Sequence, residues 1–236
     1  MSKRISARNL TKLENTFFCQ LEAEDISPAT ARPAAQLTAQ LAEKLAKCGV
    51  NFSEDKNQWI AQYWYNGDTL GKLSPNKARV EKRMRCALKN VQKIPNLAKT
   101  LQEICLKNLE AGVWARVADS QFTEEMQQHY LPVNHVFNES STSTPVRIVT
   151  DSSFTNENGI SLNMAQMKGE NNIGNLRQTL LLVRFSPILA AGDLSKFYHS
   201  FALTPQDQSL RRILIPRDWT DTNSELEELY EATMPF

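Results

Sequence analysis

The chain has 236 residues, of which 41% are hydrophobic and 22% are charged, and these proportions are ordinary for a soluble globular protein. Its net charge of +1 excludes a polycation, so an argument for nucleic-acid binding has to come from local clusters of charge. The four cysteines are widely spaced without a C-x-x-C pair, which favours reduced, buried thiols over a disulfide framework or a zinc site. No apolar run is long enough to span a membrane, and the N-terminus lacks the apolar core of a secretory signal. We therefore expect a cytoplasmic protein with no membrane partner.

Residues 1–50 are predicted to form a helical N-terminal segment. Leu10, Leu13 and Phe17 recur at helical spacing, and a second amphipathic pattern runs from Ala34 to Cys48. Gly49 follows as the expected C-terminal cap of that second helix. A helix packed in a core is the favoured interpretation, and a helix that binds a partner is the alternative.

Residues 51–128 are predicted to hold a short aromatic strand, Gln58 to Tyr65, followed by two amphipathic helices. The first helix spans residues 76–93, and the second spans Asn96 to Ala111 before Gly112 ends it.

The first of these helices has a basic side opposite its apolar side. Eight basic residues between Lys72 and Lys93 are accompanied by a single carboxylate, Glu81. The predicted basic stripe consists of Lys82, Arg85, Lys89 and Lys93. Two interpretations stay open: a surface that contacts nucleic-acid phosphates, or a solvated exterior.

Residues 129–236 are predicted to alternate strands, turns and one helix. We expect strands over Tyr130 to Phe137, Val146 to Thr150, Ile188 to Ala191 and Arg212 to Pro216. The helix from Ile173 to Phe185 is expected to bury Leu176, Leu180, Leu181 and Val183. Thr204 to Asp207 is predicted to be a turn. The predicted fold class is α+β, with a helical N-terminal region and a mainly antiparallel sheet.

Asp193 follows the expected strand Ile188 to Ala191 and precedes an aromatic turn. A carboxylate at the end of a buried strand needs a donor or a cation as a partner. It is interpreted either as a capping or turn aspartate, or as a magnesium ligand in phosphoryl transfer.

Several segments in chain order resemble known motifs. They are Tyr130-Leu-Pro with His135-Val-Phe, Thr144 to Ser153, Gly159 to Asn163, Leu181 to Phe185, and the stretch with Asp193, Tyr198, Leu203, Asp207 and Ile215-Pro216. Their order and gaps are similar to the fingers and first catalytic motif of reverse transcriptases of BEL/Pao long-terminal-repeat retrotransposons. The resemblance covers about residues 55–236 and is strongest from 130 to 216. It divides the chain into residues 1–50, residues 51–128 and a fingers and partial palm region at residues 129–236.

The resemblance implies two-metal nucleotidyl transfer with Mg²⁺, a template-primer of RNA or DNA, deoxynucleoside triphosphates and the rest of a retroelement polyprotein. It implies that Asp193 is catalytic and binds the metal together with the Leu194 carbonyl. Arg147 would brace the triphosphate, and Tyr198 would exclude a ribose 2′-hydroxyl. The alternatives from the residues alone are a surface arginine and a core tyrosine.

The chain contains no Asp-Asp pair, whereas the family brings two more catalytic aspartates on a Tyr-x-Asp-Asp hairpin. Tyr230 to Phe236 resembles the family's entry to that motif. We therefore expect a truncated polymerase that is inactive as this chain alone, located in the cytoplasm or within virus-like particles. The alternatives are a non-catalytic nucleic-acid-binding remnant or domesticated module, and a pseudogene product.

Overall fold

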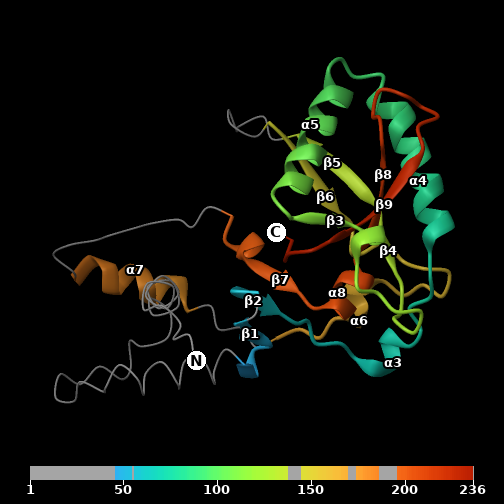
Figure 1. The fold of residues 1–236 in the computed structure, drawn as a ribbon. Helices are drawn as coiled ribbons and strands as arrows, with labels where there is room; N and C mark the ends of the chain where they lie inside the picture. The colour runs from blue at the N-terminus through green and yellow to red at the C-terminus, as the bar shows by residue number, and fades with distance from the viewer. Residues whose placement is uncertain (1–45, 55, 138–144, 170–173, 186–195, 236) are drawn as a thin grey trace. The chain divides into compact units, whose positions relative to one another are not determined.

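A computed structural model describes residues 46–54, 56–137, 145–169, 174–185 and 196–235. The protein is α+β (Figure 1). The chain divides into two compact units, residues 1–58 with 168–197 and residues 59–167 with 198–236. Most of the predicted N-terminal helical segment and the predicted strand from Ile188 to Ala191 lie outside the described residues.

The described part of the first unit contains strand β1, Val50–Ser53, and helix α7, Leu176–Phe185. Helix α7 agrees with the predicted helix from Ile173, but the predicted burial is wrong for Leu176, Leu180 and Leu181, which are all exposed. Apolar spacing identifies side chains that gain free energy from burial, but it does not supply the surface that buries them.

The helices of the second unit surround its sheet (Figure 1). They are α3 Gly67–Leu70, α4 Lys77–Val91, α5 Leu97–Glu110, α6 Leu162–Ala165 and α8 Pro205–Ser209, with 3-10 turns η1 Val117–Asp119 and η2 Tyr198–Ser200. The predicted helices at residues 76–93 and 96–111 are confirmed as α4 and α5. Helix α4 buries the predicted apolar side, Val80, Met84, Leu88 and Val91.

The main sheet has the strand order β3-β9-β8-β4, with bounds β3 Trp114–Arg116, β9 Leu226–Glu231, β8 Arg212–Pro216 and β4 Tyr130–Leu131. β9 pairs antiparallel with both β3 and β8, and β4 pairs parallel with β8. A separate antiparallel hairpin joins β5, Val133–Phe137, to β6, Val146–Thr150. Strand β2, Gln58–Ala61, pairs in parallel with β7, Phe201–Leu203.

Alternation along β8 divides the core between the two faces of the main sheet. Ile213 and Ile215 join a large cluster that contains α5 residues such as Leu101 and the hairpin residue Val133. Leu214 points to the other face and packs with Val80 and Tyr130. Since successive side chains in a strand alternate between faces, β8 is buried on both sides and forms the centre of this unit.

Three elements differ from the sequence-based expectation. The aromatic strand predicted from Gln58 to Tyr65 is shorter and ends at Ala61. The predicted turn at Thr204 to Asp207 is the start of helix α8, because the Thr204 hydroxyl accepts a hydrogen bond from the Asp207 amide (3.3 Å) and Pro205 occupies the first turn. The acidic segment that ends at Glu231 contains β9, which is not predicted from its charge. Two of its carboxylates, Glu228 and Glu231, pair with Arg212 of β8 and with Arg211 immediately before it.

Candidate functional site

The predicted magnesium ligands Asp193 and Leu194 lie outside the described residues. No three of the described His, Cys, Asp and Glu side chains come together in a group that could hold a metal ion. The structure does describe Arg147 and Tyr198, which the resemblance places at the same nucleotide site.

Arg147 lies on β6, opposite Val136 of β5, with its side chain exposed. Its strand neighbours Val146 and Ile148 turn to the other face of the hairpin and pack against the main core. Alternation therefore directs Arg147 away from the core, on a strand that the core holds in place. This position leaves its guanidinium accessible to an anion.

Tyr198 is the first residue of η2, immediately before β7, and it is 46% exposed. The position differs from the alternative of a core tyrosine. Tyr198 also acts electrostatically on Tyr63. Burial raises the pKa of Tyr63, Arg211 opposes the increase, and Glu231, Asp207 and Tyr198 add to it. Tyr198 therefore belongs to the same electrostatic neighbourhood as a buried group of charges.

The centre of that neighbourhood is a buried ion pair between Arg211 and Glu231. Arg211 Nη1 lies 3.1 Å from Glu231 Oε2, and the two side chains are 3% and 4% exposed. The second carboxylate oxygen of Glu231 accepts a hydrogen bond from the Thr150 hydroxyl (2.7 Å) at the end of β6. The Arg211 guanidinium carbon lies over the Tyr63 ring, 4.6 Å from its centroid. A continuous polar chain therefore connects the strand of Arg147 with the surroundings of Tyr198.

Asp207 attaches the segment after β2 to helix α8. The Tyr65 hydroxyl donates to one carboxylate oxygen (2.7 Å), and the Tyr63 amide (3.3 Å) and the Thr204 hydroxyl (2.5 Å) donate to the other. Burial, followed by the charge of Asp207, raises the pKa of Tyr65, so this phenol stays a donor. Because a buried carboxylate is stable only when its oxygens are satisfied, these donors account for Asp207 in the core.

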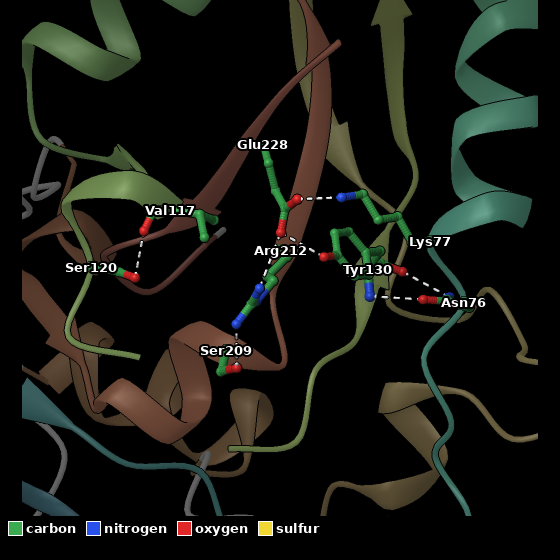
Figure 2. A network of polar contacts seen from close by, with 8 residues as sticks. All are labelled: Asn76, Lys77, Val117, Ser120, Tyr130, Ser209, Arg212 and Glu228. Carbon is green, nitrogen blue, oxygen red and sulfur yellow. Dashed lines mark hydrogen bonds and ion pairs between the residues drawn. The ribbon is translucent and has the colours of Figure 1, made fainter. Parts of the chain in front are cut away.

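Glu228 is the centre of a second network on the other face of the sheet (Figure 2). Its carboxylate receives Lys77 Nζ (2.6 Å), the Tyr130 hydroxyl (2.5 Å) and Arg212 Nη1 (3.0 Å). Burial works against the charge, but these donors together hold the pKa of Glu228 below its usual range. Asn76 adds two hydrogen bonds to the backbone of Tyr130, at 2.9 and 2.8 Å. The network joins the N-terminus of α4 to β4, β8 and β9.

His129 precedes β4 and is completely buried. Burial lowers its pKa to about 4, although a contact with the Ser74 carbonyl at 3.5 Å has the opposite effect. Its Nε2 has no hydrogen-bond partner among the described residues. The imidazole is therefore neutral near pH 7.

The four residues of the predicted basic stripe on α4 do not share one environment. Lys82, Lys89 and Lys93 are exposed, and none of them forms an ion pair with another described residue. Arg85 instead lies on the flank of the helix, where it donates to the Ser224 carbonyl (2.5 Å) and lies 3.6 Å from Glu81. Three of the four predicted cations therefore face outward, and the fourth holds the loop between β8 and β9.

Sequence patterns did not identify the buried charges Asp207, Arg211, Arg212 and Glu231, or the half-buried Glu228. One signal was present: two arginines directly precede the apolar run Ile213 to Ile215, and a glutamate-rich segment follows later in the chain. The cysteines agree in part with expectation, since Cys48, Cys86 and Cys105 are free but only Cys105 is buried.

Comparison of the chain with protein-family models gives no match, and comparison with curated proteins gives none either. Within the part of the chain that the structure describes, no helix has both the length and the apolarity needed to cross a bilayer.

Proposed function

We propose that this chain is the fingers and first half of the palm of a BEL/Pao-type RNA-directed DNA polymerase. The observation that carries the proposal is the buried chain of contacts from Thr150 through Glu231 and Arg211 to Tyr63, beside Tyr198. It couples the strand of Arg147 to the segment of Tyr198, the two residues to which the resemblance gives the incoming nucleotide. A rigid connection between two such groups suits a reaction that depends on positioning.

In this proposal the exposed guanidinium of Arg147 binds the triphosphate, because its fork of donors matches phosphate oxygens. The half-exposed ring of Tyr198 occupies the space that a ribose 2′-hydroxyl would need, so deoxynucleotides are preferred. Magnesium, held by Asp193, the Leu194 carbonyl and the substrate phosphates, would activate the attacking hydroxyl and neutralise the leaving oxygen. The partners are template-primer, deoxynucleoside triphosphate and the remaining polyprotein, in the cytoplasm or in virus-like particles.

Nucleotide binding tests this proposal directly. A fluorescent deoxynucleoside triphosphate with Mg²⁺ should bind the protein, and Arg147→Gln should weaken binding about tenfold through loss of a charge-assisted contact. Arg177→Gln on α7 removes one exposed charge elsewhere and should leave affinity unchanged. Equal affinities for the wild type and Arg147→Gln would remove Arg147 from the triphosphate site.

The family assignment has its own test in the transcript. Sequencing the transcript past the codon for Phe236 should reveal a glycine and then Tyr-x-Asp-Asp some tens of residues later. A different coding sequence there would contradict a BEL/Pao polymerase.

The second candidate function is nucleic-acid binding without catalysis, and the outward lysines of α4 favour it. Lys82 and Lys89 are exposed, and the single carboxylate of α4, Glu81, is paired with Arg85. Phosphates would compensate these charges and release counterions, so affinity should fall as salt rises.

The lysine pair offers a matched experiment. Lys82→Gln with Lys89→Gln should weaken binding of a labelled RNA or DNA and reduce its salt dependence. Lys99→Gln with Lys107→Gln removes two exposed charges from α5 and is the control. Binding that survives Asp193→Asn but depends on the α4 pair supports this candidate, and equal effects of the two double variants would refute it.

A further inference from the structure

Two arginines one turn apart on α4, Arg79 and Arg83, contact the same aromatic ring. Their guanidinium carbons lie 5.1 and 5.0 Å from the centroid of the Phe154 ring. Phe154 follows β6 in the chain and is half-buried. Such distances are within the range of cation–π contacts.

The two arginines differ in the rest of their surroundings. Arg83 is ion-paired with Asp151 at 3.3 Å, so its charge is compensated. Arg79 is exposed, donates one hydrogen bond to the Thr155 carbonyl (2.9 Å), and has no carboxylate partner among the described residues. Its planar guanidinium is thus held at the surface by the ring and the carbonyl, with its charge uncompensated.

The outward lysines continue from this arginine along the same helix. At about 100° per residue, Arg79 and Lys82 lie about 60° apart around the helix axis, and Lys82 and Lys89 about 20° apart. This surface therefore combines the planar guanidinium of Arg79, held in place, with the ammonium groups of Lys82 and Lys89 on flexible side chains. A flat guanidinium is a surface on which a nucleobase stacks, while ammonium groups suit phosphates.

We infer that Arg79, backed by Phe154, is a stacking platform for a base of single-stranded nucleic acid, and that Lys82 and Lys89 contact the adjacent phosphates. The inference extends the nucleic-acid binding proposed above for the α4 lysines. Base faces are accessible in a single strand but are stacked inside a duplex, so the platform selects single strands. An acidic peptide has charge but no flat rings, and it would use the cations without the platform.

The experiment compares two labelled strands of about 12 nucleotides, within the usual range of single-strand site sizes. One is oligodeoxythymidylate, and the other has the same phosphates but abasic sugars. Fluorescence anisotropy should show about fivefold or greater preference of the wild type for the strand with bases. Arg79→Lys keeps the charge but loses the flat face, so it should lose this preference and keep its affinity for the abasic strand.

Two further variants separate the contributions. Phe154→Leu removes the ring behind the guanidinium and should also lower only the base-dependent part, in protein whose circular dichroism matches the wild type. Lys82→Gln with Lys89→Gln should weaken both strands by the same factor, whereas Lys99→Gln should change neither.

The outcomes distinguish this inference from the function on which it rests. Equal wild-type affinity for both strands would overturn the platform while leaving phosphate binding intact. An unchanged preference in Arg79→Lys would overturn it as well. Competition by polyglutamate as effective as that by the strand with bases would assign a general polyanion surface instead. Failure of both strands to bind would refute the proposed nucleic-acid binding and the platform together.

Discussion

At the scale of single residues, the buried charges are the most consequential feature of this protein. Arg211 and Glu231 are almost inaccessible, and each supplies the opposite charge for the other. Removing one partner from such a pair leaves an unpaired charge in a medium that solvates it poorly. These residues therefore hold the β6 end of the hairpin to the main sheet more firmly than surface ion pairs could.

Glu231→Gln is expected to reduce the stability of the fold strongly. It should lower the free energy of unfolding by about 3–5 kcal/mol, because Arg211 keeps its charge without a buried counterion. Urea denaturation followed by circular dichroism measures the change.

Glu225→Gln is the matched control for that measurement. Its ion pair with Arg217 is exposed, so its removal should cost about 0–1 kcal/mol. Similar decreases in the free energy of unfolding for the two variants would show that burial does not increase the contribution of the Arg211–Glu231 pair to stability.

His129 predicts a pH dependence of stability. Its folded pKa of about 4 lies below the ordinary value of 6.5, so the unfolded chain binds a proton first as the pH falls. Stability should therefore decrease from about pH 6.5 down to about pH 4, by about 3 kcal/mol if the whole shift is realised.

The measurement is urea denaturation at several pH values, with two variants. His129→Gln cannot titrate and should have a flatter profile over this interval. His135→Gln retains His129 and should keep the wild-type slope. An identical profile for the wild type and His129→Gln would assign the pH dependence to other groups.

At the scale of elements, helix α8 shows how a few polar contacts replace an expected turn. Thr204 caps the helix and also donates to Asp207, whose carboxylate receives Tyr65 and the Tyr63 amide. The short helix therefore depends on a cap and on a distant aromatic segment. Its position sets the start of β8.

The capping contact predicts a moderate loss of stability for Thr204→Val. The variant keeps the shape of the side chain but loses the hydroxyl, and the expected cost is about 1 kcal/mol. Thr204→Ser retains the hydroxyl and should be close to the wild type in the same denaturation experiment. Equal losses for valine and serine would attribute the effect to packing of the methyl group.

At the scale of the whole molecule, the charges are balanced in number but not in position. A net charge of +1 results from 27 basic and 26 acidic side chains. Glu228 and Glu231 of β9 are paired within the fold with Lys77, Arg212 and Arg211. Lys82 and Lys89 of α4, by contrast, are exposed. A chain with almost no net charge therefore presents a locally basic surface.

An absence of polymerase activity is also predicted at this scale, because the proposed reaction requires carboxylates from more than one motif. We expect no primer extension by this chain with Mg²⁺, template-primer and deoxynucleotides, since it contains Asp193 but no Asp-Asp pair. Radiolabelled nucleotide incorporation measures the result. Robust extension that disappears in Asp193→Asn would show that one carboxylate motif is sufficient.

The sequence by itself determined the helices α4 and α5, the hairpin strands and β8. The reason is that the period of the apolar residues indicates which side of a helix or strand gains free energy from burial. It also predicted the outward direction of Lys82, Lys89 and Lys93. The tertiary structure alone decided that Arg85 turns to a neighbouring loop, that Thr204 begins a helix, and that acidic β9 is a core strand. The physical reason is that the fate of a charge depends on partners distant in the chain. Glu231 is buried because Arg211 and Thr150 meet it across the sheet, and no local pattern contains that information.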